Sequence, residues 1–304
     1  MLAWSAPIFA VWQSGCTTLT DSCEDFESQR VSRGVPFEAD DGGPAGPPST
    51  PEQCVQFCQM HLGIQNDLAC HTTAADGGLI VVCEFNTTCE GRLPAGYEPP
   101  CDDTSTPLLG RYFARMAAGE AASVTAFQQL AEELEEHGAP LELVDGAERA
   151  AAEEGRHWRI TAALARRYGA RATRGTTPPR RQRPLFELAL ENVREGVVRE
   201  TLGAAIGWWQ AARAEERAVR TAMRRIANDE SGHAELSWQL DVWVRERLST
   251  VERAQLDAAR EAAIATIGRE LEAPVDGELV RRAGFPPPPV ARALLAALRE
   301  QIFC

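Results

Sequence analysis

The chain has 304 residues, 31 Lys and Arg residues against 44 Asp and Glu residues, and a formal net charge of −13. Residues 1–105 contain eight of the nine cysteines and 15 of the acidic residues but only three arginines, so nearly all of the net negative charge lies there. A region so acidic and so poor in arginine lacks the basic surface that phosphates require, and we therefore expect no nucleic-acid partner.

The first 15 residues are apolar and uncharged and lead into Ser14-Gly15-Cys16. This stretch resembles the apolar part of a signal peptide followed by a lipoprotein cleavage site, at which Cys16 would carry the lipid. We therefore predict an exported protein, located in the periplasm, the outer membrane or the extracellular space, with membrane attachment through Cys16. A short buried N-terminal segment stays open as the alternative, because no basic residue precedes the apolar stretch. No later apolar run reaches the ~18–20 residues that a transmembrane helix needs.

Residues 16–105 are predicted to form a small Cys-rich module stabilised by disulfides. Many cysteines with few aromatic residues are typical of modules whose apolar core is too small, and disulfides persist in oxidising compartments. A metal cluster is the alternative, although no Cys-x-x-Cys occurs in the chain. Within this module we expect a linker over Asp40–Pro51, a helix over residues 51–62 and a strand over Leu79–Phe85.

After Pro107 the sequence becomes rich in Ala, Leu, Glu and Arg and is almost free of proline until Pro178. We expect an all-α fold: a four-helix bundle over residues 106–248 and a helical extension over residues 249–304. The predicted helices cover about residues 108–137, 141–168, 185–212, 213–248, 249–271, 278–283 and 290–302. No glycine or proline marks the boundary between the third and fourth of these helices.

The loop over Gly169–Pro184 is long enough to connect opposite ends of the bundle. A helix of about 29 residues spans roughly 43 Å, and 16 extended residues reach roughly 53 Å. Such a crossover would make the second and third helices parallel, as in bundles with one long connection. A disordered basic loop is the alternative, because the segment contains five arginines.

One pattern occurs twice in the helical region. Glu120 precedes the Glu154-x-x-His157 motif by 34 residues, and Glu195 precedes the Glu230-x-x-His233 motif by 35. Glutamates from two helices and Glu-x-x-His motifs from two others are the ligand set of dinuclear carboxylate sites in four-helix bundles. The six residues are therefore candidate metal ligands.

The predicted geometry brings these residues together. Glu120 and Glu154 each lie 17 residues from His137, where the first hairpin turns, so antiparallel packing puts them at one height. All six candidates also interrupt apolar stripes of their helices, as Glu120 does between Ala117 and Val124. We therefore expect their side chains to point into the bundle.

Four buried carboxylates need neutralisation, because burying one unpaired charge costs several kcal/mol or more. Two divalent cations would supply it, and Glu and His at i and i+3 can reach one ion together. Carboxylate and imidazole ligands favour iron or manganese over structural zinc. The cofactor prediction is two Fe ions, with Mn or a mixed Mn/Fe pair as alternatives. Neutralisation by Arg156 or Arg199, without any metal, stays open.

Residues of about 108–248 resemble the ferritin-like superfamily of di-iron carboxylate proteins, which includes rubrerythrin and bacterioferritin. The stretches GEAASVTAFQQLAEELEEHGAP, LENVREGVVRETLGA and IANDESGHAELSW resemble those of myxobacterial ferritin-like proteins that also carry a Cys-rich N-terminal module. The resemblance implies the same six ligands, with Glu154 and Glu195 as bridges between two ions. Two departures, the missing Cys-x-x-Cys and Val198 in place of a further glutamate, argue against a rubrerythrin-type peroxidase cycle.

Two classes of function remain open. The first is a di-iron oxidoreductase that acts on Fe(II), O2 or peroxide or oxygenates a small substrate, with an unknown reductant and with homodimer formation left open. The second is a non-catalytic metal-binding or structural protein of the cell envelope. A metal-free exported scaffold is a third alternative. Reactivity with O2 separates the first class from the second, and metal content separates both from the third.

Overall fold

The computed structural model describes the conformation of most of the helical region and of part of the Cys-rich region. The described residues are 30–36, 53, 69–75, 78–86, 92–94, 96–100, 105–177, 179–272 and 275–303. They divide into two compact units, one holding the described residues before position 88 and the other holding those from Arg92 onward. The predicted domain limits stay predictions, and the apolar stretch before Cys16 and the linker before Pro51 lie outside the described residues.

The first unit contains a three-stranded antiparallel sheet. Its strands are β1 (Arg30–Pro36), β2 (Ala69–Ala75) and β3 (Gly78–Asn86), in the order β1-β3-β2. The position of β3 confirms the predicted strand, whereas β1 and β2 were not predicted. The register of β2 and β3 makes Cys70 and Cys83 Cα partners. Of the helix predicted over residues 51–62, only Gln53 is described, and it is helical.

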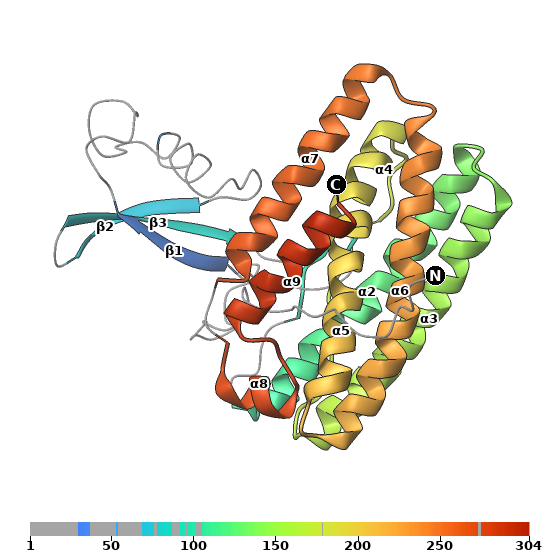
Figure 1. Ribbon diagram of the computed structural model, residues 1–304. Coiled ribbons are helices and arrows are strands. Elements are labelled where there is room, and N and C mark those ends of the chain that lie inside the picture. Colours follow the sequence, from blue (N-terminus) through green and yellow to red (C-terminus); the bar gives the residue numbers. More distant parts are fainter. Residues whose placement is uncertain are drawn as a thin grey trace. The chain divides into compact units, whose positions relative to one another are not determined.

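The second unit is all-helical, with antiparallel packing of long helices (Figure 1). Each predicted helix is present, with bounds within a few residues of those expected. Its elements are α2 (Leu108–Glu136), α3 (Leu141–Arg167), α4 (Leu185–Glu191), the π-helix η1 (Asn192–Glu200), α5 (Thr201–Arg213), α6 (Arg217–Arg245), α7 (Thr250–Glu270), α8 (Gly277–Arg282) and α9 (Pro288–Gln301). The segments α4, η1 and α5 follow one another without interruption and act as one long helix.

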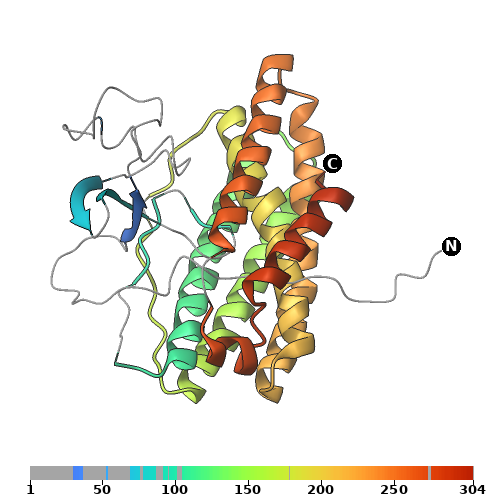
Figure 2. The ribbon, with the colours of Figure 1, turned by 60° about the vertical axis from the view of Figure 1, so that its left-hand side comes forward.

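Two core clusters at opposite ends of the bundle fix the directions of the helices. One cluster joins Leu134 and Leu143 to Leu188 and Val244. The other joins Leu109 and Leu164 to Ala211 and Val219. The start of α4 therefore lies at the end of the bundle where α3 begins, so α3 and α4–α5 run parallel. The loop between them crosses the length of the bundle, as its length predicted (Figure 2).

The connection between α3 and α4 is held against the helices by its arginines. Arg183 pairs with buried Glu133 at 2.6 Å and also with Glu191. Arg180 pairs with Glu132 at 2.9 Å, and Arg174 lies over the ring of Trp158 at 4.8 Å. These contacts explain why a segment that reads as a basic loop has a defined path along the bundle.

Helices α7 and α9 cover the outer face of η1 and α5. Val198 and Leu202 pack against Ile264 and Leu295 in a third core cluster, and both views show α7 and α9 lying side by side (Figures 1 and 2). Ser249 accepts the Glu252 N–H in a capping box, which starts α7 where the sequence predicted. No helix within the described ranges combines the length and the apolar composition that crossing a bilayer requires.

Candidate metal centre

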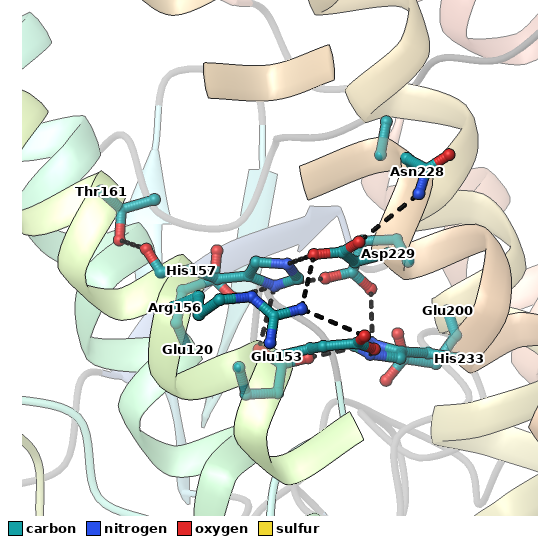
Figure 3. Close-up of polar contacts among 12 residues, drawn as sticks. Glu120, Glu153, Arg156, His157, Thr161, Glu200, Asn228, Asp229 and His233 are labelled. Atoms are coloured by element: carbon teal, nitrogen blue, oxygen red, sulfur yellow. Dashed lines mark hydrogen bonds and ion pairs between the residues drawn. The ribbon is translucent and has the colours of Figure 1, made fainter. Parts of the chain in front are cut away.

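Six ionisable side chains from the four long helices converge inside the bundle (Figure 3). Glu120 comes from α2, Glu154 and His157 from α3, Glu200 from η1, and Glu230 and His233 from α6. They form two groups that share Glu230, and within each group the potential ligand atoms lie within 4.8 Å of one another. The first group consists of Glu120, Glu154, His157 and Glu230. The second consists of Glu200, Glu230 and His233.

Glu154 and Glu230 each direct one oxygen toward each histidine. From Glu154, Oε2 lies 3.5 Å from His157 Nδ1 and Oε1 lies 3.2 Å from His233 Nδ1. From Glu230, Oε1 lies 3.2 Å from His157 Nδ1 and Oε2 lies 3.4 Å from His233 Nδ1. Two carboxylates that each face two imidazole nitrogens have the arrangement of ligands that bridge two ions.

Glu120 and Glu200 occupy corresponding places at the two ends of this set. Glu120 Oε2 lies 3.6 Å from His157 Nδ1, whereas Glu200 belongs to the group around His233. Each histidine is thus associated with one carboxylate of its own and with two shared ones. The set has an approximate two-fold symmetry, in which α2 and α3 correspond to η1 and α6.

Glu195, which the sequence placed in this set, lies outside both groups. Its side chain is 21% exposed and its Oε2 lies 3.6 Å from Arg199 Nε, while Arg199 also faces Glu270 of α7 at 3.5 Å. Glu200 stands on η1 in the position expected for Glu195. Glu200, which is not among the six candidates of the sequence pattern, is only 1% exposed.

The π-helix and the α7–α9 layer explain this difference. Hydrogen bonds between residues five apart change which side chains share a face, and π-helical turns are often found at functional sites. Val198 and Leu202 of the third long helix lie in one core cluster with residues of α7 and α9. Asn192, Gly196 and Glu200 face the inside of the bundle.

A carboxylate that directly precedes each Glu-x-x-His motif pairs with the histidine of the other motif. Asp229 Oδ2 lies 3.2 Å from His157 Nε2, and Glu153 Oε2 lies 3.1 Å from His233 Nε2. Arg156 links the two carboxylates, at 3.1 Å from Glu153 and 3.3 Å from Asp229 (Figure 3). These pairs place an N–H on each Nε2, so each Nδ1 faces the centre and can bind an ion once it has lost its proton. The sequence did contain a signal for them, an acidic residue before each motif.

Several polar atoms inside the centre have no hydrogen-bond partner. They include His157 Nδ1, His233 Nδ1, Glu154 Oε2 and Glu200 Oε2. Buried polar atoms are nearly always satisfied, so these convergent atoms point to positive species among them, protons in the metal-free protein or bound cations. The two candidate arginines pair elsewhere, Arg156 with Glu153 and Asp229, and Arg199 with Glu195 and Glu270. The donor set of carboxylate oxygens and imidazole nitrogens fits a pair of divalent cations.

The electrostatics of the group are those of a site that retains protons when no cation is bound. Burial and the Glu154 charge raise the pKa of Glu120 well above its usual value, and burial and Glu230 do the same for the pKa of Glu200. Burial opposes charging of both imidazoles, but the surrounding carboxylates outweigh it and raise the pKa of His157 and His233. The same imidazoles hold the pKa of Glu230 well below its usual value against the effect of burial.

Metal binding should therefore release protons and weaken at low pH. Ions must displace the protons that Glu120, Glu200 and the histidines hold, so affinity should fall about tenfold per pH unit for each proton displaced. We expect calorimetric titration in buffers of different ionisation enthalpy to detect this release at pH 7. An enthalpy independent of buffer would contradict it.

The same shifts predict how pH affects the stability of the metal-free protein. Groups with raised pKa stabilise the fold below their usual values, 4.5 for the glutamates and 6.5 for the histidines. That contribution is lost as the pH rises through their folded values. We expect the gain in Tm on adding metal to increase from pH 5 to pH 8, and a gain that is constant or decreasing would argue against this origin.

Replacing Asp229 by Asn should weaken metal binding without abolishing it. The amide can no longer accept the His157 Nε2–H with a negative charge, and loss of such an outer partner typically costs about 10- to 100-fold in metal affinity. Competition titration with a chelator measures this. Asp145→Asn, the same change at an exposed position of α3, is the matched control that should bind metal as the wild type does.

Comparison with protein-family models, with curated proteins and with solved structures gives no match for this chain. We therefore infer the function from the sequence pattern and from the geometry of the centre.

Proposed function

We propose that residues 108–245 form a ferritin-like bundle that holds a dinuclear metal centre, and that the bound ions are iron. The observation that carries this proposal is the placement of Glu154 and Glu230, each with one oxygen toward each histidine Nδ1. The proposed ligands are Glu120, Glu154, His157, Glu200, Glu230 and His233. Glu200 takes the place that the sequence pattern gave to Glu195, and Glu230 takes the bridging role that the resemblance gave to Glu195.

Iron is favoured by the donor set. Four carboxylates and two imidazoles are hard and intermediate ligands that suit Fe and Mn, and no described cysteine takes part. Manganese or a mixed Mn/Fe pair is the alternative within the same ligand set. Neutralisation of four carboxylates by two divalent ions supports two equivalents per chain.

We further propose that the centre is an oxidoreductase site. Two adjacent iron ions would supply the electrons for reaction with O2 or peroxide. The residues of the chain hold the centre rigid: Glu153 and Asp229 orient the imidazoles, and Thr161 and Ser237 hydroxyls bond the carbonyls of His157 and His233 at 2.8 and 2.9 Å. Phe127 lies 5.0 Å from the His233 ring and limits the access of water on that side.

Oxygen consumption tests the oxidoreductase proposal against the non-catalytic alternative. Protein purified without oxygen and loaded with Fe(II) should consume O2 faster than the same concentration of Fe(II) alone and should develop a new visible absorption. Protein loaded with Zn(II), which has no redox chemistry, is the control. Two bound iron ions that consume no O2 beyond free Fe(II) would favour a non-catalytic metal-binding protein of the cell envelope.

The location and partners proposed for the protein follow from the sequence. An apolar start before Cys16 and eight cysteines in the first 105 residues support export and lipid attachment at Cys16. We propose O2 or peroxide and a small reductant or substrate as partners, with self-association into a homodimer still open. Incorporation of labelled palmitate into the wild type but not into Cys16→Ala would support the anchor.

A further inference from the structure

Arg92 is a fully buried arginine that comes from outside the four long helices. It lies in the short segment before α2, and its side chain has 0% exposure. Leu93 and Pro94, which follow it, are also buried, and Tyr97 donates to the Ala118 carbonyl of α2 at 3.1 Å. This segment belongs to the same compact unit as the helices. A buried guanidinium is costly unless it is held by specific partners, so its contacts are informative.

Those partners connect Arg92 to the His233 side of the centre. Its Nη2 donates to Asn192 Oδ1 at 2.6 Å, and Asn192 Nδ2 donates to the Ser237 carbonyl at 2.9 Å. Ser237 in turn bonds the carbonyl of His233 through its hydroxyl. The guanidinium also lies 5.5 Å from the centroid of the Phe127 ring, which itself contacts His233. Its Nη1 lies 3.6 Å from Glu191 Oε1 of α4. The Arg92 side chain is thus held by α4, η1 and α2, and Asn192 links it to α6.

Gly196 provides the space for this side chain. A Cβ at position 196 would lie 2.4 Å from Arg92 Nη2, 2.5 Å from Ser237 Oγ and 2.7 Å from Asn192 Oδ1. Glycine in the middle of a helix costs roughly 0.5–1 kcal/mol relative to alanine. At this place the cost has a steric reason, because any larger residue would displace the guanidinium.

The main chain of Arg92 contacts the centre directly. Its N–H donates to Glu200 Oε1 at 3.0 Å, while Glu200 Oε2 is buried without a hydrogen-bond partner. Glu200 is a member of the group around His233. The hydrogen bond therefore occupies Oε1 of Glu200 and leaves Oε2 available for a cation. The other terminal carboxylate, Glu120, is oriented instead by His157 and Glu154.

We propose that Arg92 is a positioning residue of the metal centre, whose anchored side chain holds its own N–H on Glu200 so that Glu200 binds the ion beside His233 through Oε2. This inference rests on the proposed dinuclear site. According to this proposal, binding of the ion beside His233 depends on the segment that precedes α2, whereas binding of the ion beside His157 does not.

Stepwise metal titration of the full-length protein tests the role of Arg92. We expect wild type to bind two equivalents of Co(II), with visible absorption bands for each. Arg92→Ala should bind the first equivalent with unchanged affinity and spectrum and the second about 10- to 100-fold more weakly. Arg92→Lys, which keeps a cation that can reach Asn192, should recover part of this loss. Gly196→Ala, which displaces the guanidinium by another route, should reproduce the effect of Arg92→Ala.

The control is Arg245→Ala, a partly buried arginine of α6 that pairs with Asp241 and Asp257 and touches none of the proposed ligands. It should bind both equivalents normally. Equal binding of the second equivalent by wild type and Arg92→Ala would overturn the proposal, as would loss of both equivalents together with loss of helical circular dichroism. Absence of metal binding in wild type would instead overturn the proposed function.

Discussion

Glu154→Ala is expected to abolish the binding of both metal ions. Glu154 places one oxygen 3.5 Å from His157 Nδ1 and the other 3.2 Å from His233 Nδ1, so its removal takes a ligand from each ion. It also leaves two positive ions to be neutralised by three carboxylates. The loss of affinity should exceed the roughly 10- to 100-fold that is typical of an outer partner. Metal analysis after anaerobic loading and gel filtration measures it.

The same variant should lose the stabilisation that metal gives. At a free metal concentration of 100 times the dissociation constant, binding stabilises the folded wild type by about 2.7 kcal/mol. Metal should therefore raise the Tm of wild type but not that of Glu154→Ala. Glu148→Ala, an exposed glutamate on the same helix, is the control and should respond as wild type does. Two tightly held ions in Glu154→Ala would show that Glu154 is not a bridging ligand.

Glu200→Ala and Glu195→Ala are expected to differ sharply, although the two residues stand five positions apart. Glu200 lies in the group with Glu230 and His233, whereas Glu195 faces Arg199 at 3.6 Å. Glu200→Ala should retain one equivalent, beside His157, and lose the other. Glu195→Ala should retain both. Metal content and the Co(II) spectrum of each variant would separate the cases.

The reverse result would favour the assignment made from the sequence. If Glu195→Ala loses an equivalent and Glu200→Ala keeps two, then Glu195 binds metal in solution, and the register of η1 differs from the one described. If both variants lose the same number of metal equivalents, any substitution at this height of the third long helix disturbs metal binding. Glu200 would then not be identified as a specific ligand.

Much of the helical fold could be predicted from local signals. Gly138, with φ of 68°, follows α2 in the left-handed conformation, and Pro140 precedes α3. These two residues were enough to predict the turn between α2 and α3. Ser249 and Glu252 mark the start of α7 in the same way. These signals act within a few residues of each other and need no knowledge of the rest of the chain.

The turn between α5 and α6 was predicted within a few residues, but only from the lengths of the helices, because distant residues determine it. The Glu215 N–H donates to the Arg281 carbonyl, and Gly284 packs so closely on Ala214 that a Cβ would lie 2.4 Å from its nitrogen. Arg220 also donates to the carbonyls of Ala214 and Glu215. The segment around α8 thus shapes a turn that carries no glycine or proline of its own.

Part of the set of residues that converge in the centre could be predicted from the sequence. Both Glu-x-x-His motifs and Glu120 converge, as hairpin symmetry predicted, because the heights of residues on antiparallel helices depend only on the turn and the helical rise. The sequence pattern points to Glu195 and not to Glu200, because η1 has two buried faces, one toward the centre and one toward α7 and α9. An apolar stripe alone does not tell these faces apart. The burial of Arg92 depends on long-range contacts and had no signal in the local sequence.

Anomalous diffraction from crystals of the iron-loaded protein at the iron absorption edge tests the central claim most directly. Two peaks should lie between the Glu154 and Glu230 carboxylates, one beside His157 Nδ1 and the other beside His233 Nδ1. Glu120 should contact the first ion and Glu200 the second. A map with no peak among these side chains, or with iron bound only elsewhere on the protein, would contradict the account.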